Sequence, residues 1–178
     1  MSLLSYFDLC ELAEKGVITD VDPKDINATS IDVHLSNTII IESATGGLVD
    51  IAKRTMWSSA ALNIANLYYD LRPGEFVLAS TVEKFNLPDD LSAEFRLKSS
   101  GARSGLNNLF ACHCDPGWNG SALTLELKNE LCFNSIRLTH RMPIGQMLFH
   151  RVARVPADRS YAAIGRYNGD VAAQGVKV

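Results

Sequence analysis

The sequence predicts a mainly β domain with one short N-terminal helix. Two long runs are rich in apolar and β-branched residues, as is typical of strands: SIDVHLSNTIII at 30–41 and EFVLASTVEKF at 75–85. Turn-forming residues separate these runs and others like them, at Pro23, Pro73–Gly74, Pro88 and Pro116–Gly117. Many short strands between such turns favour a sandwich or barrel. With 178 residues, of which 47% are hydrophobic, the chain can bury its own core.

The elements follow in order along the chain. Residues 3–15 are expected to form the helix, with Ser2 as N-cap and Gly16 just beyond its end. SALTLELKN at 121–129 alternates strictly, so that its leucines face one way and Thr124, Glu126 and Lys128 the other. Residues 135–152 give two more strands around a turn. We expect one β domain over residues 1–164 and a mobile, glycine-containing tail or lid over 165–178.

Composition excludes several classes of protein. The net charge is −3 and no long Lys/Arg run occurs, so we expect no nucleic-acid partner. The N-terminal segment lacks the basic region of a signal peptide, and no stretch is apolar enough to span a bilayer. Four cysteines do not make a disulfide framework in a chain of this size. These features indicate a soluble cytoplasmic protein without a membrane partner.

The segment ACHCDPG at 111–117 raises the possibility of a zinc site. Cys112 and Cys114 would share one face of an extended segment, with His113 on the other. Two thiols at this spacing are too few for a closed site, and the chain lacks the ligand pattern of zinc-dependent nucleobase deaminases. We therefore expect buried strand cysteines and no zinc.

The segment KSSGARSG at 98–105 is a candidate phosphate-binding loop. Lys98 and Arg103 supply charge, Ser99 and Ser100 supply hydroxyls, and the glycines let the backbone approach an anion closely. A polar loop that leads into a helix or strand explains the same residues equally well.

Two acidic residues further on are ordinary when taken singly. Glu126 on the polar face of a strand is typical of a solvated sheet surface. Asp115 stands at the start of a turn, where Asp is common, and Trp118 fits a hydrophobic contact.

Taken together and in order, these segments resemble the dCTP deaminase branch of the dUTPase-like family. The resemblance is carried by TSIDVHLSN at 29–37, LRPGEFVLASTVEKFNLPDDL at 71–91, KSSGARSGL at 98–106, DPGWNGSALTLELKN at 115–129 and MPIGQMLF at 142–149. A fainter likeness continues in YAAIGRYNGD at 161–170.

The resemblance implies a distorted β jelly-roll subunit that forms a homotrimer with active sites between subunits. It implies hydrolytic deamination of dCTP to dUTP and ammonia, with Mg²⁺ on the triphosphate and no zinc. Glu126 would be the catalytic acid–base, with Ser99, Arg103 and Ala111 beside it. The nucleotide-binding residues implied by the motifs are Lys98, Ser99, Ser100, Gly101, Ala102, Arg103, Asp115, Thr124, Leu125, Glu126, Tyr161, Arg166 and Gln174.

The chain departs from the family pattern in a few places. Lys98 stands where arginine is usual, and His113 falls near another usual arginine. Asp170 stands where a glutamine is expected, with Gln174 further on. Three readings stay open: a deaminase, which dTTP could inhibit; a dUTP diphosphatase or bifunctional enzyme; and a nucleotide-sensing trimer without catalysis.

Overall fold

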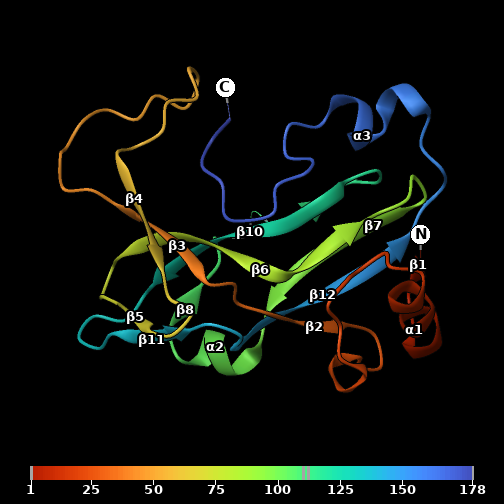
Figure 1. Cartoon of the computed structure of the whole chain (residues 1–178), viewed down its shortest axis with the longest axis horizontal. Helices are drawn as coiled ribbons and strands as arrows, with labels where there is room; N and C mark the ends of the chain where they lie inside the picture. The colour runs from red at the N-terminus through yellow and green to blue at the C-terminus, as the bar shows by residue number, and fades with distance from the viewer. Residues whose placement is uncertain (1, 110, 112, 178) are drawn as a thin grey trace.

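Two five-stranded antiparallel sheets form the body of the chain in this computed structural model, which describes residues 2–109, 111 and 113–177 (Figure 1). Hydrogen-bonded neighbours in the first sheet follow the order β1 (Ser2–Leu3), β12 (Pro143–Arg151), β7 (Leu91–Leu97) and β9 (His113–Cys114), with β2 (Ile31–His34) also on β12. The second sheet has the order β4 (Ser59–Asn63), β3 (Thr38–Glu42), β6 (Phe76–Asn86), β10 (Asn119–Asn129) and β8 (Leu106–Asn107). A separate pair joins β5 (Tyr68–Leu71) to β11 (Ile136–Thr139). The prediction of a mainly β fold is confirmed.

The hydrophobic core is formed by apolar side chains that alternate along the strands. Phe85, Phe95 and Phe149 come from β6, β7 and β12 and are fully buried. Along β10, Leu123, Leu125 and Leu127 are buried, as the alternation in the sequence predicts. The opposite face of β10 is therefore free to carry polar groups.

The pairing of β10 with β6 fixes which side chains share that polar face. Glu126 lies opposite Leu78, and Lys128 lies opposite Phe76. Directly opposed residues of an antiparallel pair point to the same side of the sheet. Leu78 and Phe76 therefore flank Glu126.

Helices are few and short. The first, α1 (Tyr6–Glu14), begins after Ser5, whose amide donates to Asp8 Oδ2 at 3.0 Å. The expected start at residue 3 with Ser2 as N-cap was wrong, because Ser2 and Leu3 pair with β12 as strand β1.

The short helices α2 (Ser99–Arg103) and α3 (Tyr161–Ile164) and the 3₁₀ turns η1 (Pro23–Asp25) and η2 (Ala157–Arg159) were not predicted, since three to five residues leave little periodicity to detect. Among the described residues, no helix is long and apolar enough to cross a membrane.

The C-terminal tail follows α3 and lies along β10 (Figure 1). The amide of Ala122 donates to the carbonyl of Asp170 at 2.7 Å, and the amide of Gln174 donates to Thr124 Oγ1 at 3.2 Å. Ala173 is buried against the body of the protein. The mobility expected of residues 165–178 stays a prediction, which the hydrogen exchange experiment below addresses.

Candidate active site

A cavity of ≈ 380 Å³ lies between β10 and the C-terminal tail. Its walls come from β10 and β6, from the segment 111–118, from the tail, and from the loop that precedes β4. This volume is in the range of small-molecule sites. Among the predicted site residues, those that line it are Ala111, Asp115, Thr124, Glu126, Tyr161 and Gln174.

Glu126 is the most unusual acid in this cavity. Burial raises the pKa of its carboxyl group to about 7, because the flanking side chains of Phe76 and Leu78 are apolar and little water solvates the charge. A carboxyl group with such a pKa can both accept and donate a proton near neutral pH, as general acid–base catalysis requires.

Asp115 lies at a more open part of the cavity. Its side chain is 58% exposed, and one carboxylate oxygen is 3.3 Å from His113 Nε2. Asp115 thus offers hydrogen-bond acceptors to a ligand at the solvent side.

The turn that follows Asp115 brings Tyr161 to the cavity. Gly117 has φ +86°, and a Cβ at this position would lie 2.0 Å from Ser160 Oγ, so only glycine fits. The amide of Tyr161 donates to the carbonyl of Pro116 at 2.9 Å. The turn and α3 are therefore packed together, and the Tyr161 ring reaches the cavity.

Two predicted residues lie near the cavity without lining it. The Leu125 side chain is in the hydrophobic core, so only its backbone could contact a nucleotide. Arg166 is exposed, and its carbonyl accepts a hydrogen bond from Lys177 Nζ at 3.1 Å.

The six predicted nucleotide-binding residues at 98–103, within the candidate phosphate-binding loop, lie elsewhere in the subunit. None of them lines the cavity that holds Glu126. They form the start and body of α2, at the lower edge of Figure 1, whereas the tail lies at the upper edge with the strands between. Ala102 instead borders a separate hollow of ≈ 360 Å³ beside β7 and β8. One subunit therefore does not bring Ser99 or Arg103 to Glu126.

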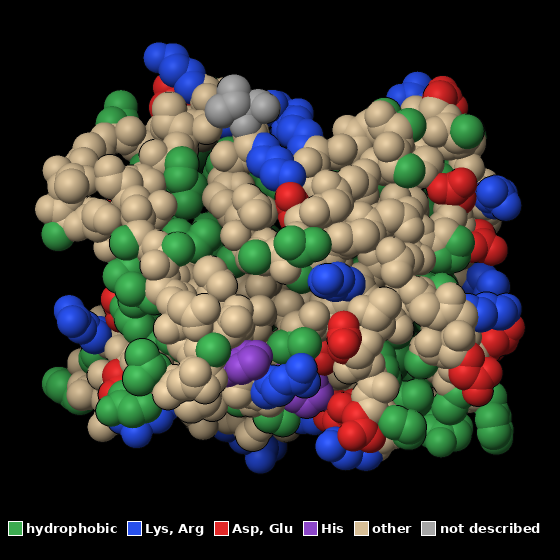
Figure 2. Space-filling view, viewed as in Figure 1, with side chains coloured by type: hydrophobic (Ala, Val, Ile, Leu, Met, Phe, Trp, Pro, Cys, Tyr) green, Lys and Arg blue, Asp and Glu red, His purple; other side chains and the backbone are tan. Residues whose placement is uncertain are grey.

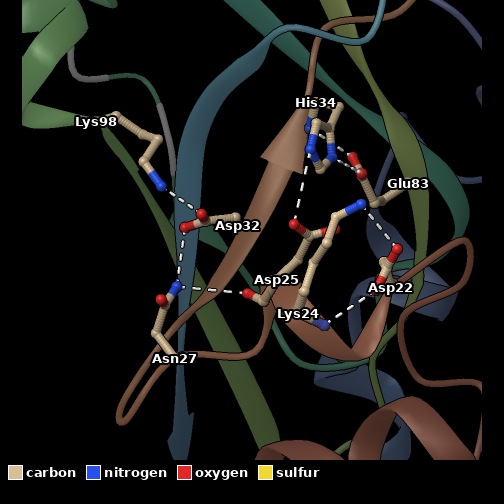
Figure 3. A network of polar contacts seen from close by, with 8 residues as sticks. All are labelled: Asp22, Lys24, Asp25, Asn27, Asp32, His34, Glu83 and Lys98. Atoms are coloured by element: carbon tan, nitrogen blue, oxygen red, sulfur yellow. Dashed lines mark hydrogen bonds and ion pairs between the residues drawn. The ribbon is translucent and has the colours of Figure 1, made fainter.

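Lys98 is engaged in a polar network that links α2 to β2 (Figure 3). Its ammonium group pairs with Asp32, whose other carboxylate oxygen accepts from Asn27 Nδ2 at 2.9 Å. Further along β2, His34 contacts the carboxylate of Glu83 through its amide at 2.9 Å and through Nδ1 at 2.8 Å. The contact with Asp32 uses one of the three N–H donors of the Lys98 ammonium group.

Among the described residues of the segment 111–117, no set of side chains is placed to bind a metal ion. Cys114 is 4% exposed and borders the cavity, whereas Cys112 lies outside the described residues. No group of three or more His, Cys, Asp or Glu side chains is placed to hold a metal ion among the residues described.

Several cavity residues were missed by sequence reasoning. They are mainly apolar or aromatic, and are Met56, Trp57, Phe76, Leu78, Trp118, Ala122, Leu123, Tyr167, Gly175 and Val176. Trp118 could have been inferred from its place in the DPGW segment. Met56 and Trp57 come from an irregular loop that has no periodic signal, so only the tertiary structure reveals them.

The face of the molecule in Figure 2 carries charged side chains of both signs. On the face in Figure 2, acidic and basic side chains are interspersed with hydrophobic ones. With a net charge of −3, attraction of an anionic ligand depends on individual Lys and Arg side chains.

Comparisons with known proteins agree with these features. The family described as dCTP deaminase-like matches residues 4–152. Two relatives, from Aquifex aeolicus and Tropheryma whipplei, are each named dCTP deaminase, dUMP-forming, and each is 34% identical. The alignments cover 94% of this chain, with 89% of the first relative and 88% of the second.

Solved structures are similar in fold. A 2′-deoxycytidine 5′-triphosphate deaminase from Agrobacterium tumefaciens has a TM-score of 0.66 at 19% identity, over 85% of this chain and 49% of that one, so this chain spans about half its length. A mutant dUTPase from phage phi11 of S. aureus, described with a structural Mg(II) ion, has a TM-score of 0.50 at 10% identity, over 78% of this chain and 86% of that one. These likenesses confirm the expected dUTPase-like β fold.

Proposed function

Because this chain belongs to the dCTP deaminase-like family, we propose that it hydrolyses the C4 amine of dCTP, with Glu126 as the proton shuttle. The observation that carries the proposal is the half-buried carboxyl group of Glu126, with its pKa of about 7, in a cavity of ≈ 380 Å³. Water adds to C4 of the cytosine, the C4–N4 bond breaks, and ammonia leaves.

Glu126 would move the protons that this reaction requires. As a carboxylate it takes a proton from the attacking water, and as an acid it protonates N3 and the departing amine. The Ala111 carbonyl, at the cavity wall, is a candidate to orient that water by hydrogen bonding. Ser99 Oγ is a second candidate, from another subunit.

A second copy of the chain would complete the site. Glu126 and the α2 residues Ser99 and Arg103 do not share a cavity within one subunit. In a homotrimer, α2 of one copy would lie at the cavity of the next, so that Arg103 approaches Glu126 and the triphosphate. Such closed, head-to-tail contacts generate rings.

The acidic side chains that line the cavity bear on how a metal ion would be held. Mg²⁺ prefers oxygen ligands and often binds through substrate phosphates together with one or two carboxylates. The cavity acids Asp115, Glu126 and Asp170 do not form a cluster of metal ligands among the described residues. We therefore propose that Mg²⁺ is held by the triphosphate, whose charge it neutralises, and that zinc takes no part.

The released nucleotide is a separate question. Deamination alone gives dUTP, as the motifs imply. The names of the Aquifex and Tropheryma relatives favour a second candidate, in which the triphosphate is also cleaved and dUMP is released with pyrophosphate. On this ground we favour dUMP as the end product.

Product analysis after incubation with dCTP and Mg²⁺ tests the proposal. We expect ammonia together with dUMP and pyrophosphate, and unchanged rates when a zinc-selective chelator is added. Accumulation of dUTP would leave deamination intact and overturn the dUMP-forming assignment. Binding of dCTP without any product would overturn the enzymatic function and favour a nucleotide-sensing trimer.

A further inference from the structure

We propose that His113 binds the triphosphate of the nucleotide and does so best when its ring is protonated. The inference rests on the proposed function, since it names a further binding residue of the same site. His113 forms strand β9 with Cys114, lines the cavity, and has a side chain that is 58% exposed. A ligand in the cavity can therefore reach it.

The walls of the cavity carry little positive charge. Among the described residues that line it, none is Lys or Arg, and only His113 has a side chain that can become cationic. Asp115, Glu126 and Asp170 also line it, and each is an acid. The negative charges of dCTP are all on its phosphates. His113 is thus the only described lining residue that can contact a phosphate as a cation.

One side of the cavity is open, and His113 lies on that side. The exposed residues among its described walls are Ala111, His113, Asp115 and Val176, and all but the last belong to one short segment. Glu126, which contacts the base in the proposed reaction, is half-buried. A charged group loses less hydration at an exposed position than at a buried one. The base would therefore lie toward Glu126, and the triphosphate would leave the cavity on the side of His113.

The two ring nitrogens of His113 have different surroundings. Nε2 lies 3.3 Å from a carboxylate oxygen of Asp115, whereas Nδ1 makes no hydrogen bond to any residue that the structure describes. In the neutral ring the single proton is placed best on Nε2, where it faces this carboxylate, and Nδ1 is then an acceptor. Protonation adds an N–H donor at Nδ1, which can donate to a phosphate oxygen.

Charged groups of both signs face His113. In the pairing of β9 with β7, His113 lies directly opposite Glu94, so the two side chains point to the same side of the sheet. Arg96 Nη2 donates to Glu94 Oε2 at 2.8 Å, which offsets the charge of that acid. The other near acid is Asp115, and the remaining acids of the cavity come from β10 and the tail. A neutral His113 leaves the charge of Asp115 unopposed, whereas a protonated one cancels it.

The expected pH dependence follows from both effects. Histidine is the side chain whose charge ordinarily changes between pH 5 and 8. As the pH falls through this range, His113 gains a donor for the phosphate, and its pair with Asp115 goes from a net negative charge to none. Both changes favour an anion, so the affinity for the triphosphate should rise as the pH falls. 2′-Deoxycytidine, which has no phosphate, should not respond to His113.

Calorimetric Kd values for dCTP with Mg²⁺, at pH 5.5 and pH 8, test the contact. The titrations use full-length chains that carry Glu126→Gln, which removes turnover and the titration of that carboxyl group. We expect the further change His113→Gln to weaken binding about five-fold or more at pH 5.5, where a charge-assisted hydrogen bond is lost, and less than about two-fold at pH 8. His113→Arg, which is charged at both pH values, should match the parent histidine at pH 5.5 and bind dCTP more tightly than it at pH 8.

Two controls separate this contact from an effect on the fold. His140→Gln changes a half-buried histidine outside the cavity and should leave both Kd values as they are. 2′-Deoxycytidine should bind equally well with and without His113→Gln at each pH. The ratio of KM values for dCTP, with Glu126 intact, gives an independent measure of the same contact.

A ratio of Kd values, His113→Gln over the parent histidine, that is the same at both pH values would overturn the inference. An equal loss of affinity for 2′-deoxycytidine would also overturn it. Ammonia release from dCTP by the parent chain is measured in parallel. If ammonia is released and the ratio does not depend on pH, the deaminase assignment stands and the contact is refuted. Binding with the expected ratio but without ammonia supports the contact and refutes the assignment, and the absence of both binding and ammonia refutes both.

Discussion

At the level of single residues, an unusual pKa alone does not identify the catalytic acid. Burial raises the pKa of Glu83 as well as that of Glu126. Glu83 is 1% exposed, and both of its carboxylate oxygens are taken by His34. Glu126 borders a cavity that can hold a substrate. Residues in structural ion pairs and catalytic residues both have perturbed pKa values. Glu126 differs from Glu83 because a ligand can reach its carboxyl group.

The raised pKa of Glu126 predicts that Glu126→Gln is stabilising at alkaline pH. The folded-state pKa of about 7 exceeds the ordinary value of 4.5, so folding favours the protonated form. That contribution is fully present below pH 4.5 and is lost as pH rises through 7. Ionised Glu126 therefore lowers the free energy of unfolding by up to about 3 kcal/mol at pH 8, a penalty that glutamine avoids.

Urea unfolding at pH 8 and pH 4.5 measures this effect. The gain in the variant should be large at pH 8 and close to zero at pH 4.5. Glu14→Gln, at an exposed position of α1, is the control and should show no such difference. If Glu126→Gln changes the free energy of unfolding by the same small amount at both pH values, the carboxyl group of Glu126 is not desolvated in the parent protein.

Sequence reasoning located Glu126 correctly on the outer face of its strand but could not predict this pKa. Alternation in SALTLELKN places Glu126 opposite the leucines, which is a local property. The burial of its carboxyl group depends on Phe76 and Leu78 of β6 and on Trp57 of a distant loop. No pattern within β10 reports those neighbours.

At the level of elements, the tail and the turn at 115–118 complete the cavity together. The Trp118 indole donates from Nε1 to the carbonyl of Tyr167 at 2.8 Å, and Ser121 Oγ donates to the same carbonyl at 2.9 Å. A hydrogen bond from Lys177 Nζ to Asp170 Oδ1, 2.6 Å, ties the end of the tail to its middle. The tail thus contacts β10 mainly through polar bonds, with Ala173 as a buried apolar anchor.

We predict that the tail acts as a lid, so that deletion of residues 165–178 leaves a folded protein that binds dCTP poorly. The strands up to β12 supply the large core side chains, whereas the deleted segment contributes little buried apolar area. KM should rise at least ten-fold and kcat should fall, because an open cavity admits water and loses contacts to the nucleotide. Steady-state kinetics and circular dichroism of the truncated chain measure both effects.

Hydrogen exchange gives an independent check on the lid. The amides of Gly169 and Gln174, which bond to Asn119 and Thr124, should exchange faster than those of β10 and slow when dCTP and Mg²⁺ are added. If these amides are equally protected with and without nucleotide, the tail is part of the static fold and the lid is refuted.

The elements also show where sequence-based prediction ends. Strands were predictable from β-branched runs and turn residues, but residues 30–41 proved to be two strands, β2 and β3. The N-terminal helix began three residues later than predicted because Ser2 and Leu3 found a partner in β12, which is distant in sequence. Local sequence patterns do not show which distant segments will pair as strands.

At the level of the whole molecule, one subunit holds an incomplete set of the residues that the family motifs predict. Glu126, Thr124 and Asp115 line the cavity, whereas Ser99 and Arg103 lie on α2, away from it. The motifs predicted both groups, and the resemblance implied active sites between subunits, but the motifs did not say which residues each subunit supplies. A homotrimer reconciles the two observations, if each cavity takes its cations from a neighbouring copy.

Complementation between two inactive variants tests this central claim most directly. Glu126→Gln and Arg103→Ala would be co-expressed with different affinity tags, and mixed oligomers that carry both tags would be assayed for ammonia release from dCTP. Each variant alone should be inactive. In a trimeric ring that contains both variants, one site in three combines an intact Glu126 from one copy with an intact Arg103 from the next. The control pairs Glu126→Gln with a chain that carries both substitutions, and it should stay inactive. Recovery of about a third of the parent activity is the predicted result, and mixed oligomers without deamination would contradict the account.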